Sequence, residues 1–296
     1  MKDAAKLAGY FAAVIITGAL LAPPLYWAGQ WAALHLSLPR LARYDFESYF
    51  HRSLLLAALV WLWPLFLLIR VRNRADLKLE RNERWLRDYF VGFGMAAIPL
   101  LCCAALLVAT HWYNLRAHPR LSGIAPAAIA ALVVPFIEET FFRGLILGLL
   151  LRSLSRWSAV IWSAALFAVL HFLKAPEQTN VIVAWFSGFV SISRAFAQFT
   201  NLPLLLGSFC TLFVLGCILA DARICTKSLW LPIGLHAGWI FTAGVFNKFA
   251  HQKTMSLPWL GQSLLVGLIP LATAGISWLA LRWWLSYAQN SRRRTA

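Results

Sequence analysis

The chain has 296 residues, of which 60% are hydrophobic and only 13% are charged, and its mean hydropathy is +0.68. Soluble domains are about half apolar and about a quarter charged, so this composition excludes an ordinary soluble domain and predicts a polytopic membrane protein. The net charge of +16 is carried mainly by short segments between apolar runs, which favours membrane topology and contact with anionic lipid over nucleic-acid binding.

Apolar runs long enough to cross a bilayer recur along the whole chain. A span needs about 20 apolar residues. Eight candidate segments meet this need: 7–29, 53–70, 89–110, 125–151, 157–173, 203–220, 229–247 and 263–286. The fold expected is an all-α bundle of about eight transmembrane helices that encloses a polar intramembrane site.

Three parts follow from this order of segments. Residues 1–124 are expected to form N-terminal helices with an interfacial segment and a basic cytoplasmic loop. Residues 125–248 are expected to form a catalytic core, and residues 249–296 a last helix with a basic tail. The piece 175–202 mixes aromatic residues with Gly, Ser and Gln, so it is expected to lie at the interface or to re-enter the membrane.

The basic residues predict the orientation of the bundle. With eight spans, 17 of the 27 Lys and Arg residues fall on the side of the amino terminus and nine on the other side. Loops rich in Lys and Arg stay in the cytoplasm, so both termini are expected there.

The strongest functional signal is a group of ionisable residues inside an apolar segment. Glu138, Glu139 and Arg143 interrupt the run 125–151, where a charge near the bilayer centre costs roughly 2.5–3.5 kcal/mol. On an α-helix Glu139 and Arg143 share a face, in the favourable order of acid before base, which predicts an orienting ion pair. Glu138 points about 100° away from this pair, and a carboxylate placed there is suited to general-base work.

Two histidines lie within other apolar segments. His171 and His236 fall on separate predicted spans, and few other ionisable residues are embedded, so they are expected to meet Glu138. One possibility is a water activated by Glu138 and His171, with His236 steadying an oxyanion. The other is a metal site, with zinc as the candidate ion and the two histidines and a carboxylate as ligands. HExxH is absent, so we favour the metal-free arrangement with no cofactor.

These residues carry a family resemblance. Glu138-Glu139-x-x-x-Arg143, then Phe167-x-x-x-His171, then His236 within Leu-Pro-Ile-Gly-Leu-His-Ala-Gly-Trp resemble the three motifs of CPBP-type intramembrane proteases. This group contains the type II CAAX prenyl endopeptidases and many bacterial Abi proteins.

The resemblance implies hydrolysis of a peptide bond within the membrane by a glutamic-type mechanism. Glu138 and His171 would activate water, Glu139 and Arg143 would support the site, and His236 would bind the oxyanion. The expected partners are the lipid bilayer and a membrane-embedded or lipid-anchored peptide or protein tail. The expected location is a bacterial inner membrane.

One position departs from the family pattern. The third motif usually ends with Asn or Asp four residues after its histidine, and this chain has Ile240 there. The loss of an oxyanion donor typically lowers the rate by about 10²–10³. Another donor can replace it, with Trp239 the nearest candidate, or His236 alone can suffice. Alternatively, the chain is a catalytically inactive relative that binds without cutting. A proton-coupled transporter is a further alternative, disfavoured because the chain has no internal repeat.

Overall fold

The structure is a computed structural model that describes residues 2–42, 44–172, 182–253, 256–261 and 263–294. Its chain divides into two compact units, one of residues 1–72 with 170–201 and one of residues 73–169 with 202–296. The three-part division at residues 124 and 248 stays a prediction.

The first unit is helical. It contains α1 (Lys2–His35), α2 (Pro39–Ala42), α3 (Phe46–Ile69), α8 (Ser187–Ala197) and the 3-10 turn η3 (Gln198–Thr200). Ala19 and Ala22 of α1 pack on Phe46 and Phe50 of α3 in a small core. The start of α3 differs from the predicted segment 53–70, because the side chain of Asp45 accepts a hydrogen bond from the backbone N–H of Ser48 and so caps the helix seven residues earlier.

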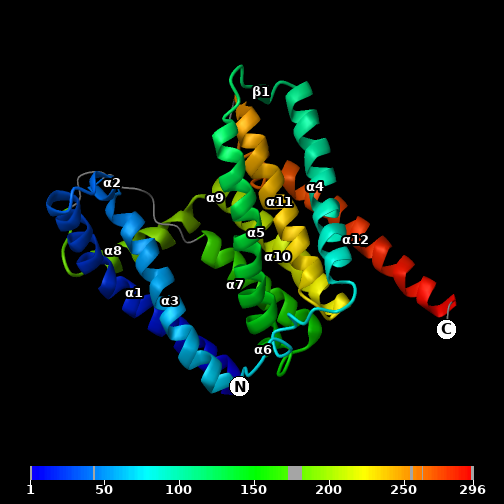
Figure 1. Cartoon of the computed structure of the whole chain (residues 1–296), viewed down its shortest axis with the longest axis horizontal. Coiled ribbons are helices and arrows are strands. Elements are labelled where there is room, and N and C mark those ends of the chain that lie inside the picture. Colours follow the sequence, from blue (N-terminus) through cyan, green and yellow to red (C-terminus); the bar gives the residue numbers. More distant parts are fainter. Residues whose placement is uncertain (1, 43, 173–181, 254–255, 262, 295–296) are drawn as a thin grey trace. The chain divides into compact units, whose positions relative to one another are not determined.

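The second unit contains the remaining elements, most of which are neighbouring helices in Figure 1. They are α4 (Trp85–Ala109), β1 (Tyr113–Leu115), η1 (Leu121–Gly123), α5 (Ile124–Glu139), η2 (Thr140–Ile146), α6 (Leu147–Leu150), α7 (Arg156–Phe172), α9 (Leu202–Leu204), η4 (Leu205–Phe209), α10 (Cys210–Thr226), α11 (Trp230–Phe249), β2 (Ala250–Gln252) and α12 (Leu268–Arg294). The two strands pair antiparallel, with Tyr113 opposite Gln252. Residues 170–172 of α7 group with the first unit.

Helix α11 packs closely on α4, and small residues permit the approach. A side chain on Gly234 would collide with the backbone of Tyr89, and one on Gly238 with the backbone of Phe93. Glycine pairs spaced in this way let helix backbones approach each other in membranes. The side chains of Leu231 to Trp239 are all buried, so α11 is the central helix of this unit.

Six described helices are long and apolar enough to cross a membrane. They are Ala5–His35, Phe46–Ile69, Trp85–Ala109, Leu121–Leu150, Leu205–Thr226 and Leu268–Tyr287. All eight predicted segments are largely helical, but α7 is short with 17 residues, and α11 carries His236, Asn247 and Lys248. The all-α polytopic fold is therefore confirmed, whereas the count of eight spans is not.

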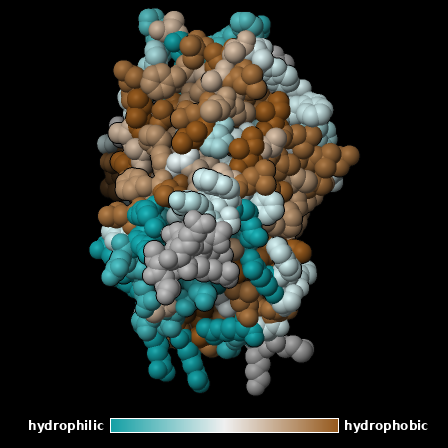
Figure 2. Space-filling model, turned by 90° about the vertical axis from the view of Figure 1, so that its right-hand side faces the viewer, coloured by the Kyte–Doolittle hydropathy of each residue, from teal (hydrophilic) through white to brown (hydrophobic). Residues whose placement is uncertain are grey.

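The protein surface fits this assignment. On the face drawn in Figure 2, hydrophobic residues cover a broad area, and hydrophilic residues gather mainly toward one end. A surface of this kind is stable against lipid chains, because it leaves few polar groups without a partner in the hydrocarbon region.

Candidate active site

The site begins where α5 changes its helical geometry. Glu139 ends α5, and residues Thr140–Ile146 form the π-helix η2 before α6 continues the segment. The sequence predicted one uninterrupted α-helix here. Short π-helical segments are rare and are often found at functional sites, because the extra residue turns neighbouring side chains in new directions.

Glu139 and Arg143 form a fully buried ion pair. Arg143 Nη1 lies 3.0 Å from Glu139 Oε1, and both side chains are 0% exposed. The second guanidinium nitrogen, Nη2, donates to the backbone carbonyl of Gly216 in α10 at 3.3 Å. The guanidinium carbon lies 4.3 Å from the centre of the Phe167 ring in α7, a favourable contact between a cation and an aromatic face. The pair expected from the spacing of these residues is present, and it links three helices.

His236 extends from α11 to the two adjacent glutamates. Its Nδ1 lies 2.8 Å from Glu139 Oε1, within hydrogen-bond distance. Its Nε2 lies 3.7 Å from Glu138 Oε2, which is within the range of an ion pair and beyond that of a direct hydrogen bond. An ionised carboxylate only accepts hydrogen bonds, so opposite an ionised Glu139 the donor in this contact would be Nδ1 of His236.

This contact of Glu139 with His236 was not predicted from the sequence. The sequence predicts that His236 meets Glu138, and it predicts Arg143 as the partner of Glu139. The same oxygen, Glu139 Oε1, takes both contacts. The side chain of Glu139 therefore fixes two cationic or polar groups from different helices, and it orients the imidazole ring as carboxylates do for metal-bound or catalytic histidines.

Glu138 differs from Glu139 in its surroundings. Its side chain is 24% exposed, and that of Glu139 is 0% exposed. The neighbouring carboxylates are thus divided into a buried one and a more accessible one. General-base chemistry needs a carboxylate that substrate and water can reach, so this division suits Glu138 to that role.

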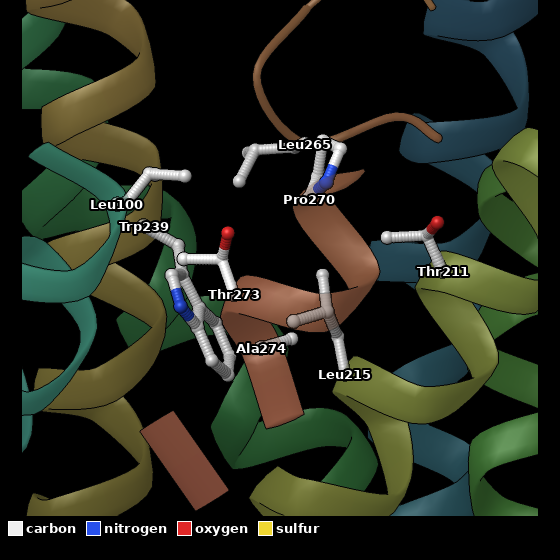
Figure 3. Close-up of a pocket in the computed structure, with 8 residues that line it drawn as sticks. All are labelled: Leu100, Thr211, Leu215, Trp239, Leu265, Pro270, Thr273 and Ala274. Atoms are coloured by element: carbon white, nitrogen blue, oxygen red, sulfur yellow. The ribbon is translucent and has the colours of Figure 1, made fainter. Parts of the chain in front are cut away.

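The remaining predicted residues lie in different surroundings. His171 is exposed in the last turn of α7 and groups with the first compact unit, so its pairing with Glu138 stays a prediction. Trp239 is 2% exposed and belongs to the core between α4, α10 and α12. Figure 3 shows its indole beside Thr273 and Ala274 in a small pocket, and its oxyanion role also stays a prediction. Ile240 is half-buried.

Metal-ligating residues do not gather in the described part of the chain. Among the described residues, no three His, Cys, Asp or Glu side chains are placed to hold a metal ion. The metal-free site therefore stays a prediction.

The fold and the buried group of charges define a class of protein: an all-α, multi-pass membrane protein with a Glu–His–Arg cluster inside its helices. Comparison with known families finds a match to the middle of the chain. A family model described as type II CAAX prenyl endopeptidase Rce1-like matches residues 119–242. The matched segment contains all three motifs and confirms the resemblance. At the level of the family, the resemblance is to a protease-type hydrolase. No curated protein and no solved structure matches the chain.

Proposed function

We propose that the chain is an intramembrane endopeptidase that hydrolyses a peptide bond in a membrane-associated peptide or protein tail. The observation that carries the proposal is the position of His236. Its Nδ1 is held by buried Glu139, and its Nε2 is directed toward the more exposed Glu138. An imidazole fixed at one nitrogen presents the other nitrogen in one orientation, which is the arrangement that general acid–base catalysis uses.

The proposed mechanism uses His236 in its protonated form. Glu138, Glu139 and Arg143 together carry one net negative charge when all three are ionised, and a protonated His236 makes the four groups neutral. Neutrality is favoured in a low-dielectric interior, where unbalanced charge is costly. A protonated His236 has an N–H at Nε2 that can donate to a developing oxyanion.

The mechanism that we propose starts from water. Glu138, with His171, takes a proton from a water molecule as its oxygen attacks the carbonyl carbon of the scissile bond. His236 donates a hydrogen bond to the carbonyl oxygen as it becomes an oxyanion. When the carbon–nitrogen bond breaks, Glu138 returns the proton to the leaving amine. Glu139 and Arg143 hold the imidazole and the helix in place throughout.

The surroundings of the chain follow from the same proposal. The loops rich in Lys and Arg would place both termini in the cytoplasm, and the family resemblance favours a bacterial inner membrane. Substrates would reach the embedded site from within the bilayer. No metal or cofactor enters the proposed reaction, and a zinc-dependent reaction is the alternative.

Cleavage of a membrane-peptide library by the protein in proteoliposomes tests the proposal. Wild type should cleave a subset of the library, and Glu138→Gln and His171→Ala should each lower the rate by about 10²–10⁴, as expected for lost general-base catalysis. Unchanged rates in both variants would refute the roles of Glu138 and His171. Activity that is lost with a chelator and restored by zinc would show that the reaction is metal-dependent.

A catalytically inactive binding protein is the second candidate, and Ile240 is the observation that favours it. The residue four positions after His236 has no donor in its side chain, where the family usually has an amide or a carboxyl. Ile240→Asn restores a donor at that position. A gain in rate of about 10²–10³ in this variant would show that the wild-type chain is limited by this position. Retained peptide binding without cleavage in both proteins would favour the binding role.

A further inference from the structure

Arg223 is a buried arginine that lies outside the candidate active site. It sits one turn before the end of α10, is only 9% exposed, and its Nε is buried without a hydrogen-bond partner among the described residues. The guanidinium lies beside α6, where a side chain on Gly148 would make ordinary van der Waals contact with Nη2 at 3.7 Å. A buried guanidinium nitrogen that has no partner among the described residues is unfavourable, so an anion from outside the protein would stabilise it.

The nearest acid along α10 is occupied elsewhere. Asp221 lies 2.8 Å from Arg156 of α7 and 3.3 Å from Arg282 of α12. It is two residues from Arg223, so the two side chains point to nearly opposite sides of the helix. Lys227 follows Arg223 by one turn and adds a second positive charge. The group therefore has an excess of positive charge beside a buried arginine.

Tryptophans mark this end of the second unit as a membrane interface. Trp157 follows Arg156 directly and is 63% exposed, and Trp283 follows Arg282 directly and is 69% exposed. The rings of Trp85 and Trp230, at the starts of α4 and α11, lie 4.9 Å apart. Tryptophan is enriched at the level of the lipid headgroups, where phosphates lie. Asp221 joins α10 to both tryptophan-bearing helices, so Arg223 lies near the same level.

We propose that Arg223 binds the phosphate of an anionic membrane lipid. The planar guanidinium matches phosphate geometry, and the excess positive charge favours anionic over zwitterionic lipid. This site is separate from the proposed proteolytic reaction and does not depend on it.

Native mass spectrometry of the full chain in detergent tests the proposal with two lipids, phosphatidylglycerol and phosphatidylcholine. Wild type should bind phosphatidylglycerol in preference. Arg223→Gln should weaken that binding about tenfold, the scale of one lost charged hydrogen bond. Arg84→Gln removes the same charge from an exposed site at the start of α4 and should leave the affinity within about twofold.

Two further measurements identify the source of the phosphate and allow for a variant that does not fold. Inorganic phosphate should not displace the lipid, and if it binds at Arg223 equally well the lipid assignment is wrong. If Arg223→Gln does not fold, Arg223→Lys keeps the charge and loses the planar fork, and the stabilisation of its thermal unfolding by phosphatidylglycerol should fall below that of wild type. Equal lipid binding, or equal stabilisation, in the Arg223 variant and wild type overturns the proposal.

Discussion

Replacing Glu139 by glutamine tests whether one buried carboxylate holds two side chains from different elements. The carboxylate and Arg143 are both 0% exposed, and its Oε1 is also 2.8 Å from His236 Nδ1. Removing one partner of a buried ion pair leaves the other charge uncompensated, which costs about 3–5 kcal/mol. In a chain of this size such a loss lowers the melting temperature by about 10 °C.

The neighbouring carboxylate supplies a matched control. Glu138→Gln makes the same substitution one residue earlier at a side chain that is 24% exposed, and it should leave the free energy of unfolding within about 1 kcal/mol of wild type. A double variant, Glu139→Gln with Arg143→Met, removes both charges and should recover at least half of the loss.

The assay is denaturant unfolding of the purified variants in bicelles, followed by tryptophan fluorescence. A Glu139→Gln protein as stable as Glu138→Gln would refute the assignment of Glu139 as the buried anchor. A double variant less stable than Glu139→Gln alone would show that Arg143 has other stabilising contacts of greater weight.

Three further predictions concern packing and surface charge. Gly234→Ala should sharply reduce the folded yield, because its added carbon would overlap the Tyr89 backbone. Gly94→Ala on α4 would meet only the Ile98 side chain, at 4.0 Å, and should fold normally. Size-exclusion profiles distinguish the two variants. Burial raises the pKa of Tyr113 to about 12, so the folded protein holds this proton more tightly than the unfolded protein. The free energy of unfolding should therefore fall as pH rises from about 10 to 12. Tyr113→Phe should remove this component of alkaline unfolding. Asp221→Asn should lower the free energy of unfolding by only about 1 kcal/mol, because both arginine partners of Asp221 are partly exposed. The loss should be smaller in high salt, and denaturant unfolding at two salt concentrations checks this.

The sequence was sufficient to predict the helical segments, because apolar length determines which residues can cross a membrane. Their ends were less predictable. The start of α3 was misplaced because Glu47 lowers the apolar character of its first turn, yet Glu47 is buried and accepts a hydrogen bond from Ser191 of α8 at 2.9 Å. That contact joins residues 144 positions apart, and no local pattern reveals it.

The candidate site shows the same limit. The spacing of Glu139 and Arg143 on one helix was enough to predict their ion pair, since helix geometry fixes neighbours four residues apart. The bond from His236 to Glu139 depends on how α11 is rotated about its own axis. That rotation follows from the glycines that press α11 against α4, and their effect emerges only after the two helices pack.

The π-helical segment η2 has a consequence for how related chains should be compared. A π-helical segment holds one residue more than an α-helical path would require, and here it lies between Glu139 and Leu147. A relative that lacks one residue here would keep a continuous helix, but the faces before and after the deletion would turn by about 100° relative to each other. The two carboxylates and the glycines at 144 and 148 could then no longer all face their present neighbours at the same time. A one-residue gap in this stretch of a sequence alignment therefore indicates a different site geometry, even where every motif residue is retained.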